Sequence, residues 1–450
     1  MPAVQPSTFD PFETARAVSS GRGLCVLDGA RMGGWSRLFV DPVAVFRSKN
    51  GRGILSWTDG RTESADGDAF RFLDALFQRC PELVAAGYWG YDLRYQLERL
   101  PHLAHDDLQL PDCWVALYDR VQVFGCSGVQ ALGRPGGSTV PFDGFISTQS
   151  GCGEPQPVYA PTPTPEHPTS EYRGSVVQSI SRLQYEINVR KVLDYIAAGD
   201  CYQVNLSQRF SAPLPCSPWE LYERLRAVSP APYAAYLDCG DHQVLSSSPE
   251  LFLSASGGCV ETRPIKGTRP RGRTPEDDRA IAAELLKSEK DRAELLMIVD
   301  LERNDLGRVC EFGSIHVPAL YTLESFANVH HLVATVRGKL RAGTSPLECL
   351  RAAFPGGSIT GAPKIRAMEI IEELEPFRRG VYTGAIGWVD GAGNAEWNIA
   401  IRTILVRGGS AYFHVGGGIV ADSDPASEYE ETLTKAAGML RALGSRPSPH

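Results

Sequence analysis

The residue best suited to covalent chemistry in this chain is a lysine in an arginine-rich run. The segment TRPIKGTRPRGR contains Arg263, Lys266, Arg269, Arg271 and Arg273. Such a run is typical of a phosphate-binding patch or of a solvated loop. Lys266 differs because it stands in Pro-Ile-Lys-Gly-Thr, where proline and glycine favour an unusual local backbone. In a shielded cleft, burial and like charge would disfavour its charged form and leave the neutral amine that a nucleophile requires.

Two further segments carry pairs of acids at helical spacing. Asp291 and Glu294 lie in KDRAELLM, and Glu428 and Glu431 lie in SEYEETLTKA, with Lys435 one turn further on. Residues at i and i+3 project from the same face of a helix. The two faces could hold Mg²⁺, which prefers oxygen ligands and usually keeps several waters. The alternative is ordinary solvated surface, where most acids on helices are found.

Two glycine-rich runs could contact anions. FPGGSITGAPK resembles a phosphate loop only superficially, because that loop needs Gly-Lys-Ser/Thr together and Lys364 here follows Pro363. Nucleotide binding is excluded on that ground. In HVGGGIV, the residues Gly416, Gly417 and Gly418 could present bare backbone amides to a carboxylate, or could simply form a tight turn.

The elements that must position these residues fall into two regions. The first 132 residues alternate short apolar runs with turn signals, including Asn50-Gly51 at a hairpin tip, and predict an N-terminal antiparallel-sheet subdomain. One helix, DAFRFLDALFQRC, should pack on that sheet through Phe70, Leu73, Leu76 and Phe77. Residues 133–170 are rich in Pro, Gly, Ser and Thr and are interpreted as a linker.

Residues 171–445 form the second region, which should carry the chemistry. A helix is predicted in LQYEINVRKVLDYIAAGD and should end at Gly199. Further helical patterns are EDDRAIAAELLKSEKDRAELLMIVDLERNDL, APKIRAMEIIEELEP and PASEYEETLTKAAGMLRAL, and strands are interleaved with them, including AYFHVGGGIV. This mixture predicts an α+β fold rather than a regular doubly wound sheet.

Composition excludes several classes of protein. Hydrophobic residues are 43% and charged residues 22%, as in globular proteins, and no apolar stretch is long enough to span a membrane. The net charge of −8 gives no general attraction for nucleic acid or anionic lipid. No secretory signal is evident, and the scattered cysteines contain no C-x-x-C pair, so we expect a cytoplasmic protein with reduced thiols.

Six motifs in order point to a family. They are SSPE, RPIKGTRPRG, AELLMIVDLERND, FPGGSITGAPK, YTGAIGW and GGGIVADSDP. They closely resemble the chorismate-utilising enzymes, which include anthranilate synthase, isochorismate and salicylate synthases and aminodeoxychorismate synthase component I. The resemblance implies a layered α/β/β/α sandwich of mostly antiparallel sheets flanked by helices.

The resemblance also implies roles for individual residues. Glu294 and Glu431 would bind Mg²⁺ directly, with Asp291 and Glu428 in the outer shell, and Glu250 would be the general acid that protonates the departing C4 hydroxyl. The residues expected at the substrate are Thr268, His331, Tyr382, Arg402, Gly416, Gly417, Gly418 and Lys435.

Within the family, two positions favour amination at C4. This chain reads PIKGT where anthranilate and isochorismate synthases usually read PIAGT, and it has Gln203 where isochorismate synthases place a lysine base. By resemblance, Lys266 would attack C2 of chorismate, and ammonia from a partner glutamine amidotransferase would then yield aminodeoxychorismate, a precursor of p-aminobenzoate and folate. Anthranilate synthase component I and a non-catalytic homologue are the alternatives.

Overall fold

The computed structural model describes residues 23–29, 36–125, 128–133, 176–326 and 329–444. From residue 134 onward, the predicted linker lies outside the described residues. In the described ranges no helix is both long and apolar enough to cross a membrane.

Two large sheets dominate the molecule, one of eleven strands and one of twelve. In spatial order the first sheet consists of β10 (Val177–Gln178), β11 (Gln203–Pro213), β23 (Ser410–Ile419), β22 (Thr403–Arg407), β13 (Gln243–Ser248), β12 (Tyr233–Asp238), β1 (Cys25–Asp28), β2 (Ser36–Phe39), β8 (Val121–Gly125) and β9 (Gly128–Gly133), with β19 (Gly361–Ala362) paired to β11. The second consists of β16 (Ile265–Pro270), β18 (Val329–Lys339), β15 (Cys259–Arg263), β14 (Leu251–Ser256), β21 (Ala395–Ile399), β20 (Ala385–Asp390), β6 (Val84–Trp89), β7 (Cys113–Tyr118), β3 (Ala44–Lys49), β4 (Arg52–Trp57) and β5 (Thr62–Ser64), with β17 (His316–Ser325) paired to β18.

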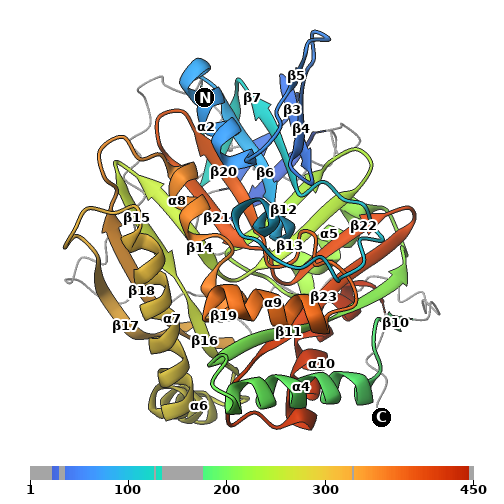
Figure 1. Cartoon of the computed structure of the whole chain (residues 1–450), viewed down its shortest axis with the longest axis vertical. Coiled ribbons are helices and arrows are strands. Elements are labelled where there is room, and N and C mark those ends of the chain that lie inside the picture. The colour runs from blue at the N-terminus through green and yellow to red at the C-terminus, as the bar shows by residue number, and fades with distance from the viewer. Residues whose placement is uncertain (1–22, 30–35, 126–127, 134–175, 327–328, 445–450) are drawn as a thin grey trace, which may run out of the picture.

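Helices cover the outer faces of the two sheets (Figure 1). They are α2 (Ala69–Arg79), α3 (Arg94–Leu97), α4 (Arg182–Ala197), α5 (Pro218–Val228), α6 (Pro275–Lys287), α7 (Glu289–Gly307), α8 (Pro346–Ala353), α9 (Lys364–Leu374) and α10 (Pro425–Ala442), with 3₁₀ turns η2 (Tyr91–Leu93) and η3 (Gly357–Ile359).

Three apolar layers hold the sandwich together. Between the sheets, Trp114 and Trp388 of the second sheet pack in one cluster with Leu237 of the first. Outside the first sheet, α5 and α10 bury residues such as Trp219 against it. Outside the second, α2, α7 and α8 bury residues such as Leu295. The predicted α/β/β/α arrangement of antiparallel sheets is confirmed.

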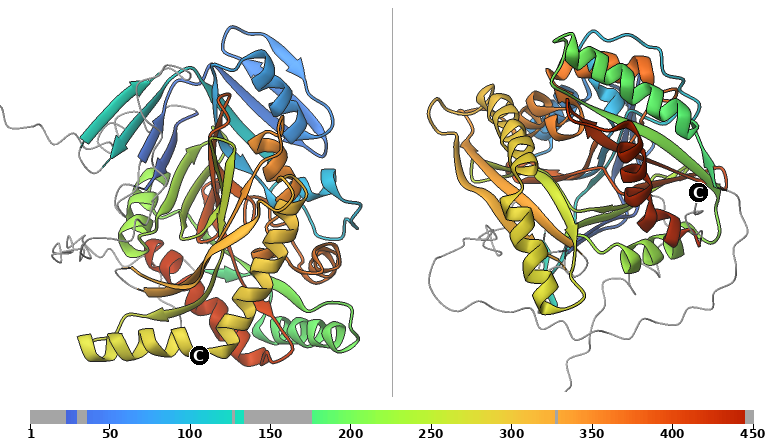
Figure 2. Two further views of the ribbon diagram at one scale, coloured as in Figure 1. Left: turned by 90° about the vertical axis from the view of Figure 1, so that its left-hand side faces the viewer. Right: turned by 90° about the horizontal axis from the view of Figure 1, so that it is seen from below.

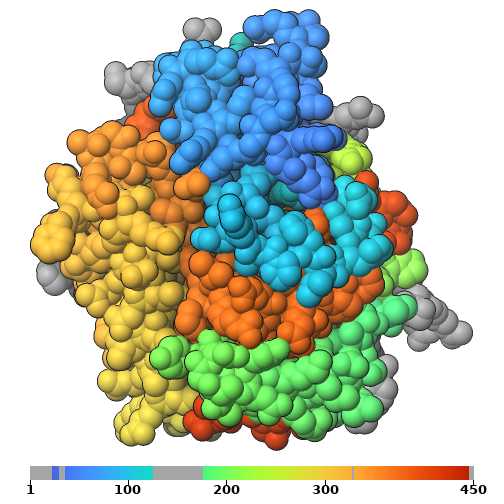
Figure 3. All heavy atoms as spheres, in the orientation of Figure 1, coloured from blue at the N-terminus to red at the C-terminus, as the bar shows by residue number. Residues whose placement is uncertain are grey.

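The surface in Figure 3 shows how α9 and α4 complete one side of the molecule. α9 forms a band between α4 and the segment that follows β6. Both helices bury residues against β11, with Val189 of α4 and Ile371 of α9 in the same cluster as Leu206. This packing positions β11, which runs beside the glycine-rich β23.

Strands of the predicted N-terminal subdomain enter both sheets. β1 pairs with β12 in the first sheet, and β6 pairs with β20 in the second. One core layer therefore contains side chains from both predicted regions, as Trp114 and Trp388 illustrate. The division at residues 132 and 171 stays a prediction, with backbone pairing across it.

Local sequence signals explain several elements as expected. Asp68 caps α2 by accepting the N–H groups of Phe70 and Arg71, and the predicted apolar face of this helix is buried. The β3–β4 hairpin turns at Asn50 and Gly51, whose φ angles of 50° and 73° suit this Asn-Gly pair. Both predictions are confirmed.

One predicted helix is instead two. The pattern EDDRAIAAELLKSEKDRAELLMIVDLERNDL is broken at Ser288, which has ψ of 106° and accepts the N–H of Asp291 through its side chain. Ser288 thus ends α6 and caps α7, and Figure 2 shows the two helices running in different directions. Residues 287–294, KSEKDRAE, contain no glycine or proline, so no helix-breaking residue marks the break in the sequence.

Candidate active site

Two predicted site residues lie where the chain crosses from one sheet to the other. Glu250 lies between β13 of the first sheet and β14 of the second, and Arg402 lies between β21 of the second and β22 of the first. The N–H of Ile399 donates to the carbonyl of Glu250 at 3.1 Å, and the N–H of Ser247 donates to the carbonyl of Arg402 at 3.1 Å. The two crossings are therefore joined by backbone hydrogen bonds, which hold both side chains at the junction of the sheets.

Arg402 has a left-handed backbone and a partly buried side chain. Its φ is 50°, a region that a residue with a Cβ occupies at a cost. Burial lowers the pKa of Arg402, opposed by the charge of Glu250. The charge of Glu250 thus favours the charged guanidinium of Arg402 against the effect of burial.

Lys266 lies on β16 beside Gly267, which leaves room for side chains of α6 and α7 to approach the strand. Gly267 has φ of 76°, and a Cβ there would lie 2.8 Å from Cδ1 of Leu285 and 2.9 Å from Cγ of Asp291. Burial lowers the pKa of Lys266, and Lys435 acts in the same direction, whereas the carboxylates of Glu294, Glu250 and Glu431 oppose them. The partly buried amine therefore lies among the predicted acids.

The arginines near Lys266 do not supply the like charge that we expected. Arg269 pairs with Asp291 at 3.0 Å and Arg271 pairs with Asp278 at 2.6 Å. The cation that affects the pKa of Lys266 most is Lys435, from α10. The predicted direction of the pKa shift agrees with the structure, but its cause is burial and a lysine distant in sequence.

Glu250 is buried, with 6% of its surface exposed, and accepts a hydrogen bond from Oγ of Ser358 to Oε1 at 3.0 Å. Burial raises its pKa, and the charge of Lys266 and the bond from Ser358 oppose that rise. A carboxyl held toward its neutral form can act as a general acid.

Acids from α7 and α10 meet beside β23. Burial raises the pKa of Glu294 and of Glu428. Burial also acts to raise the pKa of Glu431, but the charge of Lys435, 2.7 Å from Oε1, outweighs it and the pKa is lowered. Asp291 is engaged by Arg269. Four carboxylates that are two local pairs in the sequence thus face one region.

The donor set suits a hard cation. Across the described ranges, no three His, Cys, Asp or Glu side chains converge closely enough to form a ready-made metal cluster. Mg²⁺ often takes only one or two protein carboxylates and fills its shell with water and substrate oxygens. Oε2 of Glu428 is buried without a hydrogen-bond partner, which leaves an oxygen available for such a shell.

The three glycines lie in the strand predicted for AYFHVGGGIV, which is confirmed, and the alternative of a tight turn is wrong. Gly416, Gly417 and Gly418 belong to β23 and pair with β11. A Cβ on Gly417 would lie 2.9 Å from Oε2 of Glu428 and 3.5 Å from Oε1 of Glu431. Glycine here makes room for the acids of α10, and Lys435 donates to the carbonyl of Gly416 at 2.9 Å.

Of the other predicted substrate residues, His331 and Tyr382 are buried near this region, whereas Thr268 is exposed. Thr268 and His331 face each other on β16 and β18, with Oγ1 and Nδ1 2.9 Å apart. Burial lowers the pKa of His331 to about 3, so the ring is neutral at physiological pH. Tyr382 stacks on His414 at 5.2 Å between ring centroids, and burial raises its pKa to about 12.

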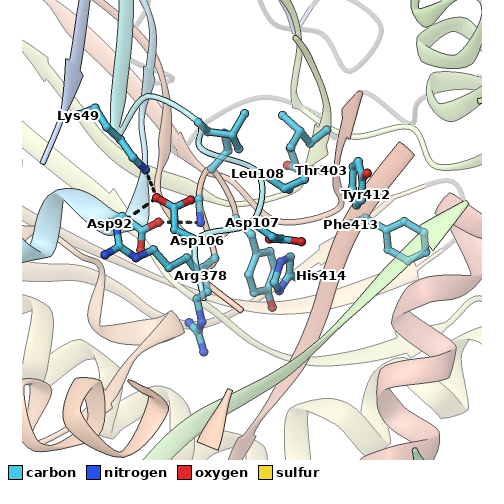
Figure 4. A pocket seen from close by; sticks show the side chains of 16 residues that line it. Lys49, Asp92, Asp106, Asp107, Leu108, Arg378, Thr403, Tyr412, Phe413 and His414 are labelled. Atoms are coloured by element: carbon cyan, nitrogen blue, oxygen red, sulfur yellow. Dashed lines mark hydrogen bonds and ion pairs between the residues drawn. The ribbon is translucent and has the colours of Figure 1, made fainter. Parts of the chain in front are cut away.

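A small cavity behind Tyr382 is separate from the predicted nucleophile. It has about 30 Å³ of free volume, enough for about one water molecule. Figure 4 shows Lys49 and Asp106 paired at one end and His414 at the other. Tyr382 lines this cavity, but neither Lys266 nor Glu250 does, so the cavity does not contain the candidate nucleophile or acid.

Sequence reasoning missed two residues of this site. Ser358 lies in FPGGSITGAPK, which we considered only for phosphate binding, and His414 lies just before the glycines in HVGGGIV. Lys364 of the first motif donates to Asp305 at 2.7 Å, in keeping with the exclusion of a phosphate loop. Only the positions of Ser358 and His414 beside functional motifs could have indicated them.

Known proteins are similar to this chain over nearly its whole length. The family model for chorismate binding enzymes matches residues 24–441. Aminodeoxychorismate synthase component 1 of Bacillus subtilis is 38% identical over 98% of this chain and 96% of its own length. Anthranilate synthase component 1 of Thermus thermophilus is 40% identical over 93% of this chain and 91% of its own.

Among solved structures, anthranilate synthase component I of Streptococcus pneumoniae superposes with a TM-score of 0.76 and 31% identity, covering 98% of this chain and 99% of that one. The matched residues include both sheets and all the motifs described above. The chain belongs to the chorismate-binding enzyme family.

Proposed function

We propose that this chain converts chorismate and ammonia to 4-amino-4-deoxychorismate and water, with Lys266 as a covalent nucleophile. The observation that carries the proposal is a partly buried lysine, with a lowered pKa, among Glu250, Glu294 and Glu431. A neutral amine is the form that attacks carbon. Relatives named aminodeoxychorismate synthase component 1 support the same reaction.

The proposed chemistry consists of two displacements. Nζ of Lys266 bonds to C2 while the ring double bonds shift and the C4 hydroxyl leaves as water, having taken the proton of Glu250. Ammonia then bonds to C4, the double bonds shift back, and the C2–N bond breaks to release Lys266 as an amine. The proton lost by the new ammonium group returns to Glu250, so both groups are regenerated.

The remaining residues bind and orient the substrate. Arg402 and Tyr382, with Lys435 and the amides of β23, would hold one carboxylate, since a guanidinium suits two-point carboxylate recognition. Thr268 and His331 would lie on the other side of the ring, paired at 2.9 Å. When bound, Mg²⁺ would offset the charge of the ring carboxylate. Glu294 and Glu431 would hold it, with Asp291 and Glu428 outside them.

Gln203 supports amination rather than hydration. Its side chain is fully buried, and neither its amide oxygen nor its amide nitrogen has a hydrogen-bond partner. The amide lies beside Gly418, where a Cβ would be 3.1 Å from Nε2. A carboxamide cannot accept a proton from water as a lysine can.

The proposal includes a second protein. Component 1 in the names of the relatives implies another component, and we propose a glutamine amidotransferase as the ammonia donor, with both proteins in the cytoplasm. The product would serve as a precursor of p-aminobenzoate and folate.

The decisive assay uses purified protein with chorismate, Mg²⁺ and ammonium. We expect a product that an added lyase converts to p-aminobenzoate. Anthranilate synthase is the second candidate, because a relative of that name is 40% identical. Fluorescent anthranilate formed without the lyase would contradict the proposal, and so would the absence of any chorismate turnover.

A further inference from the structure

Ser358 stands on a turn that is held from several sides. The turn is η3, and a Cβ on Gly357 would lie 2.2 Å from Cδ2 of Leu301, so the backbone is pressed against α7. Oγ1 of Thr360 donates to the carbonyl of Gly356 at 2.9 Å. Nη1 of Arg379 donates to the carbonyl of Ile359 at 3.1 Å. The hydroxyl of Ser358 is therefore presented from a backbone with little freedom.

The hydroxyl is directed at one oxygen of Glu250. Oγ of Ser358 and Oε1 of Glu250 are 3.0 Å apart, and both residues are 6% exposed. A buried serine that donated to a backbone carbonyl would not affect a catalytic group. Here the acceptor is the carboxyl that the proposed reaction uses as its acid. In a protonated carboxyl the carbonyl oxygen is the better acceptor, so a bond to Oε1 places the proton on Oε2.

We propose that Ser358 is a positioning residue for the general acid. Its hydroxyl holds Oε1 as an acceptor, so that Oε2 delivers the proton to the leaving C4 hydroxyl. The O–H bond at Oε2 then breaks, water leaves, and the resulting carboxylate is stabilised by the same bond from Ser358. This inference rests on the proposed role of Glu250.

The charges around Glu250 come from four elements. Lys266 of β16 and Lys435 of α10 interact with it, as does Arg402 in the second crossing. Glu302 of α7 also faces it, and its own pKa is raised well above the ordinary value, first by burial. Burial thus favours the neutral form of Glu302, while the basic groups around Glu250 are Lys266, Lys435 and Arg402. Ser358 is the side-chain hydroxyl that donates to it.

Loss of the Ser358 hydroxyl should change the pH dependence of kcat in a predictable direction. The bond from Ser358 lowers the pKa of Glu250 against the effect of burial. Without that bond, the pKa of Glu250 rises further. Because the acid works in its protonated form, the fall in kcat at high pH should begin at a higher pH. At the plateau, kcat should be lower, since the carboxylate formed in the transition state loses its donor.

The test compares Ser358→Ala, Ser358→Thr and Ser358→Cys in the full chain with chorismate, Mg²⁺ and ammonium. Chorismate consumption is followed against pH. We expect S358A to lower kcat about tenfold or more, to change KM little, and to move the alkaline limb upward by roughly one pH unit, as for a hydrogen bond to a charged group. S358T keeps a hydroxyl, so its kcat and its alkaline limb should match those of the wild type. S358C has a similar volume and a weaker donor, so its kcat and its alkaline limb should lie between those of S358A and S358T.

Two outcomes would overturn the inference: an unshifted alkaline limb in S358A, or S358C behaving as the wild type. If S358A does not fold, S358C and S358T still test the inference, which predicts a lower kcat and a shifted alkaline limb for S358C. Because chorismate consumption is the readout, failure of this inference is distinguishable from failure of the proposed function. In the latter case the wild type would consume chorismate to a different product, or would not consume it.

Discussion

Nζ of Lys435 lies 2.7 Å from Oε1 of Glu431 and 2.9 Å from the carbonyl oxygen of Gly416. This lysine therefore neutralises a predicted Mg²⁺ ligand and joins α10 to the glycine-rich strand β23. A cation bound at Glu431 would have to share that carboxylate with Lys435. The strength of the metal site should then depend on the charge of Glu431.

Glu431→Gln should weaken Mg²⁺ binding in the presence of chorismate by at least about tenfold, since even residues outside the first shell of a metal contribute that much. Calorimetric titration of the purified protein with Mg²⁺ measures this without relying on activity. Glu430→Gln is the matched control, because Glu430 is an exposed neighbour on the same helix and pairs with Arg182 at the surface. Equal affinities for both variants would exclude Glu431 as a ligand.

Incubation with chorismate in the absence of ammonia should leave a covalent adduct on Lys266. Intact mass spectrometry should show an increase equal to chorismate less one water. Lys266→Ala should lose that adduct and most of the activity, whereas Lys287→Ala, at an exposed end of α6, should retain both. Unchanged turnover in K266A would rule out the covalent route.

Gly417→Ala should disturb the acids of α10, because its Cβ would lie 2.9 Å from Oε2 of Glu428. We expect a loss of about 1–3 kcal/mol in the free energy of unfolding, as for overpacked interiors, together with weaker Mg²⁺ binding. Gly307→Ala is the control, since its Cβ would meet only Cδ1 of Ile315 at 3.9 Å. Denaturant unfolding and metal titration of both variants check the prediction, and identical behaviour of the two would contradict it.

Arg379→Ala should be strongly destabilising. Its guanidinium is buried, pairs with Glu375 at 2.7 Å, and donates to the carbonyl of Asn205 at 2.6 Å. Removal of one partner of a buried pair leaves an uncompensated charge and costs about 3–5 kcal/mol. Arg366→Ala removes a surface pair with Asp200 and should cost about 0–1 kcal/mol. Urea unfolding measures both, and similar losses would show that burial does not matter here.

Much of the fold could be predicted because its signals are local. The face of α2 and the Asn50-Gly51 hairpin depend on residues a few positions apart, and side-chain periodicity with turn chemistry determines them. The pairing partners of the strands could not be predicted in this way. β6 pairs with β20, although about three hundred residues separate the two strands in the sequence, and no local pattern indicates that contact.

The same distinction between local and long-range information applies to the candidate site. The sequence alone was enough to single out the candidates: Lys266 in its Pro-Gly setting, and two acid pairs whose shared faces follow from the geometry of a helix turn. Only the tertiary structure decided that the acids of α7 and α10 meet beside Lys266, that Lys435 rather than an arginine is the influential cation, and that Ser358 faces Glu250. The reason is physical, because burial and charge depend on distances between elements, and those distances exist only once the two sheets have packed.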